Sequence, residues 1–313
     1  MSFVFKYKLY YLIPIVLIGI LFLSARPYSN SQSNTNNKPF NNPKFDKYWN
    51  QGKGEITSYE LEQARYGELH KGHAVLIFVT EPFSKSKQVK LNTIHRNEED
   101  VVQVLKLNFS KKFATGIYDY SILQSVFTPI DINNYDNTIK VTTSIQDWCG
   151  HTFTQLNLQT YKYKVLLNSY FESEGDQEFQ IEQSILEDEL WNLIRIAPSE
   201  LPTGSFQMIP SIATTRLQHH SLDIEDVEAS LSPHADNKEL MTYALNFSIS
   251  QRSLKIHYHK KFPHEIEGWE ETYIDSGKEL TTKATRKKTL LCDYWNKNRI
   301  LNNDLRKELG LED

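Results

Sequence analysis

The amino-acid sequence predicts a mainly β protein of the α+β class, built as one antiparallel curved sheet or as two β-lobes, behind an N-terminal transmembrane helix. Many segments alternate apolar and polar side chains, which is the period of a half-buried strand. Clusters of Asn, Asp, Gly, Ser and Lys bound these segments, and the short connections favour antiparallel neighbours. An uncharged apolar run at residues 9–25 supplies the third observation.

The apolar run at residues 9–25 predicts an uncleaved signal-anchor, with residues 1–8 in the cytoplasm. Lys6 and Lys8 precede the run, so the positive-inside rule predicts that the body lies outside the cytoplasm. A cleaved signal peptide is the alternative. Cleavage after Ala25 would place the bulky Leu23 at the −3 position, where a small residue is required. The expected membrane partner is therefore contacted through residues 9–25.

Residues 26–43 predict a flexible linker between this anchor and the body. Asn, Ser and Pro dominate the segment, and no apolar residue recurs at a regular spacing. A segment of this composition cannot bury enough apolar surface to fold by itself. The β-rich extracytoplasmic domain is therefore expected at residues 44–313.

The first half of the body is expected to contain one short helix followed by strands. Thr57 and Glu60 form a capping-box pattern, and Gly67 can end the helix that this pattern predicts. The following strands are expected at Glu68–Glu81, Val101–Phe109, Ile117–Phe127, Thr138–Ile145, Thr152–Leu158 and Tyr161–Phe171.

A helix is expected at Ser184–Ile196, where apolar residues recur at helical spacing and Pro198 prevents continuation. This interruption leaves two architectures open: two lobes that divide near residues 184–200, or a single sheet that the helix covers. A short helix is also expected at Asn303–Leu311. The second set of strands is expected at Phe206–Ala213, Thr214–His219, Leu240–Ser248, Ser253–Tyr258, Thr272–Ile274 and Thr281–Thr285.

The body is acidic, which argues against a nucleic-acid partner. The chain has 35 Lys and Arg against 39 Asp and Glu, and residues 1–43 hold four of the cations and none of the acids. Residues 44–313 therefore contain 31 cationic and 39 acidic residues, a net charge of −8. Non-specific binding to nucleic acid needs a basic surface. Phosphate-cradling, dinucleotide-binding and metalloprotease motifs are absent from the sequence, so no cofactor is expected.

Asp147, Cys149 and His151 form the sharpest candidate for catalysis. In an extended segment these three side chains would share one face, and a thiolate beside an imidazole and a carboxylate is a nucleophile arrangement. The alternative is that Gly150 makes a turn or bulge, that Trp148 and Cys149 fill the core, and that His151 forms only local hydrogen bonds.

Cys149 and Cys292 are the only cysteines, and outside the cytoplasm they are candidates for a disulfide bond. Such a bond would tie the middle of the chain to its C-terminal part. It would also exclude Cys149 as a nucleophile.

Glu267, Trp269 and Glu270 form a candidate binding site. Carboxylates that flank a tryptophan can perform acid–base work on a sugar, or the indole ring can stack on one. The alternative is a charged hairpin whose arms attract each other across the strand pair. His257 and His259 share one face of an expected strand, but lysines surround them, and no metal site is predicted.

Eight segments together resemble a known family: residues 48–68 (YWNQGKGEITSYELEQARYGE), 146–153 (QDWCGHTF), 170–179 (YFESEGDQEF), 186–195 (LEDELWNLIR), 201–211 (LPTGSFQMIPS), 267–273 (EGWEETY), 280–286 (LTTKATR) and 293–298 (DYWNKN). The chain resembles exported, usually membrane-anchored proteins of Gram-negative bacteria, over residues 44–312. The resemblance implies an inner-membrane protein with its body in the periplasm.

Members of that family often carry the label "septum formation inhibitor Maf". The label implies a cytoplasmic α/β enzyme that hydrolyses nucleoside triphosphates to monophosphates and pyrophosphate. Maf proteins open with a strand and a Ser-x-x-Arg-Arg turn that binds phosphate. Here Ser24-Ala25-Arg26-Pro27 lies at the predicted membrane exit, and no such turn opens the body.

The sequence therefore predicts a binding or envelope-structural role without catalysis. Large curved sheets can hold apolar ligands on their concave face, and the strands contain many Tyr and Phe. Two hydrolase alternatives remain: an enzyme that uses Cys149 and His151 or the carboxylates beside Trp269, and the nucleotide pyrophosphatase that the Maf label implies.

Overall fold

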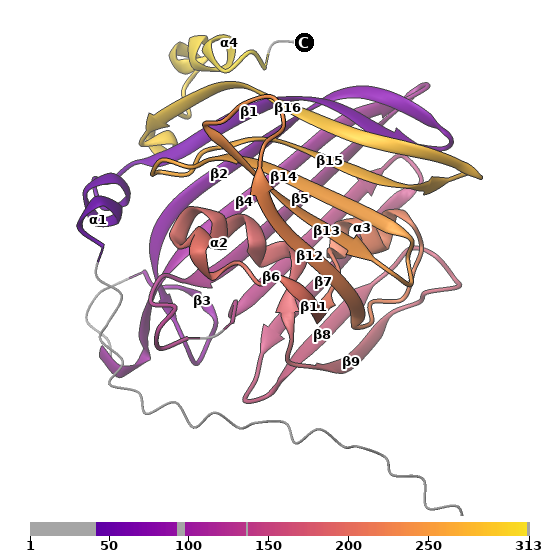
Figure 1. Cartoon of the computed structure of the whole chain (residues 1–313), viewed down its shortest axis with the longest axis horizontal. Coiled ribbons are helices and arrows are strands. Elements are labelled where there is room, and N and C mark those ends of the chain that lie inside the picture. The colour runs from indigo at the N-terminus through magenta and orange to yellow at the C-terminus, as the bar shows by residue number, and fades with distance from the viewer. Residues whose placement is uncertain (1–41, 93–97, 136, 312–313) are drawn as a thin grey trace, which may run out of the picture. The chain divides into compact units, whose positions relative to one another are not determined.

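The computed structural model describes residues 42–92, 98–135 and 137–311, all of which belong to one compact unit. The expected cytoplasmic segment, membrane helix and linker lie outside the described residues, except for Asn42 and Pro43. In the described ranges, sixteen strands form a single, largely antiparallel sheet (Figure 1). None of the helices in these ranges has the length and apolar character needed to cross a membrane.

The first part of the sheet comprises β1 (Gly54–Arg65), β2 (Glu68–Ser84), β3 (Val89–Lys90), β4 (Val101–Thr115), β5 (Tyr118–Pro129), β6 (Lys140–Asp147), β7 (Gly150–Leu158), β8 (Lys162–Asn168) and β9 (Gln177–Glu182). The second part comprises β10 (Ile185–Leu186), β11 (Gly204–Ile209), β12 (Glu225–Pro233), β13 (Leu240–Phe247), β14 (Arg252–His259), β15 (Ile266–Asp275) and β16 (Lys278–Cys292). The α-helices are α1 (Pro43–Trp49), α2 (Leu190–Ile196), α3 (Ile212–Leu217) and α4 (Asp304–Glu308), and a 3-10 turn at Glu187–Glu189 precedes α2.

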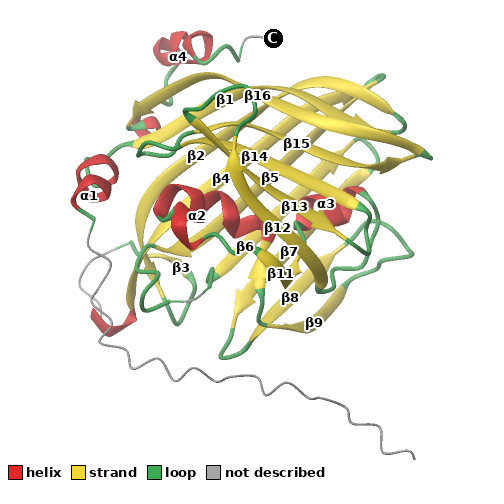
Figure 2. Cartoon of the chain, viewed as in Figure 1, coloured by secondary structure: helices red, strands yellow, loops and turns green. Residues whose placement is uncertain are grey.

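The sheet is curled, and its two edge strands follow each other directly in the sequence. Strand β9 is one edge and β10 is the other, yet only Gln183 and Ser184 separate them in sequence. The amide of Gln183 donates to Tyr161 beside β8, while the hydroxyl of Ser184 donates to the carbonyl of Gln207 in β11. The sequence left two architectures open, and the structure has the one with a single sheet. Figure 2 shows α2 and α3 lying in the hollow of this sheet.

Helix α2 is enclosed by the concave face, which explains why it is buried on nearly every side. The Trp191 ring packs edge-on against Phe109 of β4 and Trp269 of β15, with centroid separations of 5.1 and 5.3 Å. Arg195 makes a two-pronged ion pair with Glu55 of β1, with N–O distances of 2.5 and 2.6 Å. The helix thereby joins strands from both halves of the chain.

Most of the expected elements are confirmed, with shifted ends. The six strands expected between residues 68 and 171 correspond to β2 and β4–β8, and five of the six later ones correspond to β11 and β13–β16. The helix expected at Ser184–Ile196 is present only from Leu190, because Ile185 and Leu186 pair with β11. The expected C-terminal helix is present as α4, whereas strands β3, β9, β10 and β12 and helix α1 were not predicted.

The helix expected between Thr57 and Gly67 is wrong, because this segment is β1. Its residues pair with β2 over Glu55–Arg65 and with β16 over Gly54–Glu62. A helix cap stabilises by only about 1 kcal/mol. Two flanking strands and burial on both faces outweigh that local preference.

The strand expected at Thr214–His219 is also wrong, because most of it belongs to α3. Two adjacent threonines favour a strand in isolation. In the structure, however, the hydroxyl of Thr215 donates to the carbonyl of Ser211 at 2.7 Å, one helical turn earlier. Ile212, Ala213 and Leu217 are buried, so the helix is held by tertiary packing.

Candidate functional site

The predicted nucleophile group is not assembled at Asp147, Cys149 and His151. Trp148 and Cys149 form the turn between β6 and β7. Oδ1 of Asp147 accepts the backbone N–H groups of Cys149 and Gly150, at 2.6 and 3.2 Å, so this carboxylate shapes the turn. Among the described residues, no hydrogen bond joins the Cys149 thiol to His151. The alternative was correct about the turn but wrong about the core, since Trp148 and Cys149 are both exposed.

The predicted Cys149–Cys292 disulfide is absent, and both cysteines are free. Cys292 lies opposite Gly54 at the start of β1, whereas Cys149 follows β6 at the other end of the strands. Strands β1, β2, β4 and β5 lie between β16 and β6 in the sheet. Adjacent strands are about 4.8 Å apart, and a disulfide requires Cα atoms within about 7 Å.

Thiol titration checks this arrangement. Cys149 is expected to react with a thiol reagent in the folded protein, because its side chain is exposed. Cys292 is partly buried, and burial raises the pKa of its thiol, so it is expected to react more slowly. Two thiols per chain are expected after denaturation without reductant. If no free thiol is detected after denaturation, the two cysteines form the predicted disulfide bond.

The predicted binding group at Glu267, Trp269 and Glu270 is divided between the two faces of β15. Trp269 is buried in the core, where its ring lies 5.0 Å from Tyr59. Glu267 and Glu270 face outward and pair with Arg286 and Lys283 of β16, at 2.8 and 3.7 Å. The structure therefore has the alternative arrangement, a charged hairpin whose two strands attract each other through ion pairs. In the described part of the chain, no group of three or more His, Cys, Asp or Glu residues is placed to hold a metal ion.

The part of the concave face around α2 is filled, which argues against an apolar ligand at that place. A cavity of about 20 Å³ lies between Phe109, Trp191, Trp269 and the polar groups beside them. That space holds about one water molecule. Lys111 of β4 also lines it, and the ammonium group makes no hydrogen bond or ion pair with the described residues. Burial lowers the pKa of Lys111.

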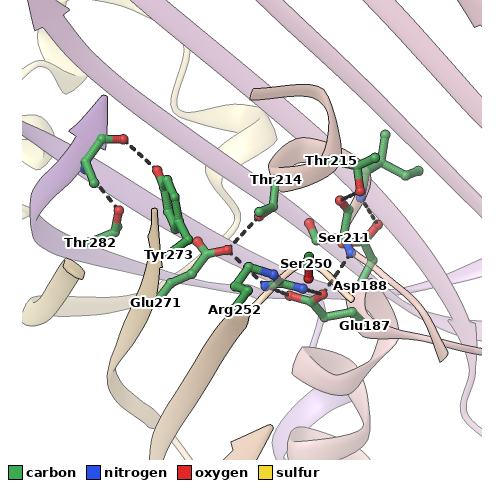
Figure 3. A network of polar contacts seen from close by, with 12 residues as sticks. Glu187, Asp188, Ser211, Thr214, Thr215, Ser250, Arg252, Glu271, Tyr273 and Thr282 are labelled. Atoms are coloured by element: carbon green, nitrogen blue, oxygen red, sulfur yellow. Dashed lines mark hydrogen bonds and ion pairs between the residues drawn. The ribbon is translucent and has the colours of Figure 1, made fainter. Parts of the chain in front are cut away.

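A network of buried charges lies next to this cavity and holds α3 (Figure 3). The Arg252 guanidinium of β14 pairs with Glu187, which precedes α2, and with Glu271 of β15 at 2.9 Å. Glu271 accepts the hydroxyl of Thr214 at 2.8 Å. Glu187 accepts the backbone N–H of Ser211, also at 2.8 Å. These contacts fasten α3 to two strands and to the start of α2.

Two buried carboxyl groups beside this network have raised pKa values. Burial, and then the charge of Glu187, raise the pKa of Asp188 to about 7. Burial raises the pKa of Glu189 to about 7 as well, although the amide of Thr138 donates to it. Both groups therefore bind protons in the folded protein at a pH where the unfolded chain has released them.

These two carboxyl groups are therefore expected to contribute less stability as the pH rises from about 4 to about 7. In this window the folded state holds more protons at Asp188 and Glu189 than the unfolded state does, so their contribution to the free energy of unfolding falls. Between pH 5.5 and 8, each carboxyl is expected to account for roughly 2 kcal/mol. Urea unfolding at both pH values measures the change. Asp188→Asn should reduce the difference, whereas exposed Glu178→Gln should leave it unaltered.

A larger cleft of about 380 Å³ lies on the other side of α3 and is called the α3 cleft here. It has the volume of a small-molecule site. Its walls come from strands β7–β9, from the loop between β8 and β9, from α3 and from the segment that follows α3. The lining side chains include Glu174, Gln177, Phe179, Arg216, His219 and Asp223.

Glu174 organises the charged wall of the α3 cleft. Its Oε1 accepts from Arg216 at 2.6 Å and lies 2.9 Å from Nδ1 of His219, while its Oε2 accepts the hydroxyl of Ser169. Burial lowers the pKa of Arg216, although Glu174 opposes this shift. Nε2 of His219 makes no hydrogen bond with the described residues, so the imidazole retains a polar atom for a ligand.

The backbone at His219 is strained. This residue has φ of 55°, in the left-handed region, and follows Gln218, the C-cap of α3. Glycine is usual at this position, and another residue there costs roughly 1 kcal/mol or more. The strain places the imidazole beside Glu174. Strained residues of this kind cluster at functional sites.

Asp223 completes the cleft with a carboxylate that has no ion pair or hydrogen bond among the described residues. None of the cleft residues was predicted as a site from the sequence. Glu174 falls within residues 170–179, one of the segments that carry the family resemblance. The other usable signal was the pair His219-His220 followed by Asp223, which the wrong strand prediction obscured.

No protein-family model matches the chain, and no curated protein matches it. The resemblance to exported, membrane-anchored proteins therefore stays a prediction.

Proposed function

We propose that the protein is a membrane-anchored, extracytoplasmic binding protein without catalysis, which recognises a polar, positively charged ligand in the α3 cleft. The observation that carries this proposal is a cleft of about 380 Å³ with organised charges on one wall and a free carboxylate at Asp223. The location rests on the apolar run at residues 9–25 and on the lysines before it. Together with the resemblance, these features support an inner-membrane anchor with the body in the periplasm.

The charges of the cleft favour a cation. Arg216 is paired with Glu174, so the positive charge on this wall is already compensated. Asp223 then gives the cleft one carboxylate that no cation among the described residues pairs with. An acidic cleft concentrates cations and speeds their association. His219 and Gln177 offer further hydrogen-bonding groups for an amide or hydroxyl of the ligand.

Lysine amide is a suitable probe, because it joins a cationic side chain to a peptide-like group. It is expected to bind the full-length protein in zwitterionic lipid nanodiscs, as followed by calorimetry. Asp223→Asn is expected to weaken this binding about tenfold, since it removes the free carboxylate. Asp236→Asn is the matched control, because Asp236 is exposed in the connection between β12 and β13, away from the cleft.

Equal binding of lysine amide and norleucine amide would contradict the proposed cation preference. Equal losses in both aspartate variants would show that the cleft is not the site. The two hydrolase alternatives are tested by incubating the same protein with ester substrates and with nucleoside triphosphates and Mg²⁺. Product release that depends on Cys149 or His151 would replace the binding proposal.

A further inference from the structure

The hairpin turns at one end of the sheet share an unusual feature. Six of them carry at least one large apolar side chain between 46% and 84% exposed, at the turn or within two residues of it. These side chains are Tyr66, Leu69, Ile117, Trp148, Tyr170, Ile249 and Ile274. We call this end of the sheet, together with the segment after α3, the apolar-tipped rim.

The antiparallel order of the strands places all six turns at the same end. The turns after β1, β4, β6 and β8 lie at this end, and the turns between them in sequence lie at the opposite end. The β13–β14 and β15–β16 turns also lie at this end, because their strands continue the antiparallel order. The carboxylate of Asp275, beside the β15–β16 turn, accepts the N–H of Gly67 in the β1–β2 turn at 2.7 Å. This end lies on the right in Figure 1, near α3, while α1 lies on the left.

The same rim holds the net charge of the whole body. The rim consists of the six turns and the segment between α3 and β12, each taken with two residues on either side. These are residues 64–69, 114–119, 146–151, 167–178, 216–226, 246–253 and 274–279. These residues include twelve Asp or Glu and four Lys or Arg, which gives −8. Residues 44–313 contain 39 acids and 31 cations, so the rest of the body has 27 of each and is neutral. The charge is therefore concentrated at one end.

We propose that the apolar-tipped rim is a docking surface for a polypeptide partner that presents cationic and apolar side chains. The proposal deepens the proposed function, because the α3 cleft opens within this rim and would receive one cationic side chain of the partner. Exposed apolar side chains spread over several turns mark an interaction surface. Complementary charge then selects the partner and speeds the encounter.

Charge also argues against the other occupants of such a surface. An anionic lipid surface would be repelled by a net charge of −8 at the rim. A second copy of this chain docked rim to rim would bring two such charges together. A small cation by itself would leave the apolar side chains of the rim in water. A basic polypeptide satisfies both the charge and the apolar surface.

The test uses the full-length protein in zwitterionic lipid nanodiscs and a labelled octapeptide of alternating lysine and tyrosine. Fluorescence anisotropy is expected to show binding that weakens as NaCl is raised from 50 to 500 mM. The variant Ile117→Ser/Trp148→Ser/Ile249→Ser is expected to bind at least tenfold more weakly. The control Tyr161→Ser/Trp295→Ser/Ile300→Ser removes exposed apolar side chains away from the rim and should bind within twofold of the unmodified protein.

The inference is overturned if the two variants lose the same affinity, or if neither loses any. It is also overturned if an octapeptide of alternating glutamate and tyrosine binds equally well, or if the rim variant reduces binding to anionic vesicles instead. The cleft proposal fails separately. If lysine amide does not bind but the octapeptide still depends on the rim side chains, the docking surface stands without the cleft.

Discussion

Arg252→Met is expected to lower the free energy of unfolding by about 3–5 kcal/mol, one of the two largest effects of a single substitution predicted for this protein. Arg252 is almost completely buried and pairs with Glu187 and Glu271, which are buried as well. Methionine would leave both carboxylates in the interior without their cation. Removing one partner of a buried ion pair is costly for this reason.

The loss should extend to the α3 cleft. Glu271 holds Thr214, and Glu187 holds the backbone of Ser211, so both carboxylates position α3. Urea unfolding followed by circular dichroism measures the stability. Arg286→Met is the matched control, because Arg286 is partly exposed and its ion pairs are expected to contribute less than about 1 kcal/mol. Similar losses in both variants would contradict the role assigned to the buried network.

A further variant separates charge from packing. Arg252→Met combined with Glu187→Gln and Glu271→Gln removes the cation and both anions together. Replacing a buried ion pair as a unit is often nearly neutral, so this variant is expected to regain much of the lost stability. If the triple variant is as unstable as Arg252→Met, then the shape of the arginine matters more than its charge.

Trp269→Ala is expected to destabilise the protein by a similar amount, about 3–5 kcal/mol. Its indole ring contacts Tyr59, Phe109 and Trp191, with ring centroids 5.0, 5.2 and 5.3 Å apart. These contacts join β1, β4, β15 and α2 in the middle of the core. Alanine would leave a large cavity that rigid neighbours cannot close.

Trp148→Ala provides the comparison for Trp269→Ala, because the Trp148 ring is 69% exposed in a turn. Its effect on the free energy of unfolding is expected to stay within about 0.5 kcal/mol. The same pair of variants tests the earlier interpretation of Trp269 as a ligand-stacking residue. That interpretation requires a folded Trp269→Ala protein of normal stability, with altered binding alone.

The alternation of apolar and polar residues was sufficient to predict most of the sheet. In β4–β8 it is regular because one face meets the core and the other meets water, and this difference is visible in sequence. The prediction failed at β1, where both faces are covered. There, Ile56 packs under Leu309 and Leu311 from the C-terminal segment. The pattern of neighbouring residues cannot show that a strand is covered by side chains some 250 residues away in the sequence.

The candidate site shows the same division. The residue types that can do chemistry were identifiable, but Asp147 proved to shape a turn and Trp269 to fill the core. Glu174, Arg216 and His219 are separated by up to 45 residues. They meet because the sheet curls and returns α3 to the loop after β8. No short-range pattern encodes that meeting.

The sequence by itself determined the β-rich class, the acidic character of the body and most strand positions, because each depends on composition or on neighbours within a few residues. The tertiary structure alone decided that a single sheet closes on α2, that the two cysteines stay apart, and that the surplus acids gather beside the α3 cleft. The physical reason is that side-chain burial and charge pairing are set by contacts between distant segments. Those contacts stabilise a residue far more than its local conformational preference does.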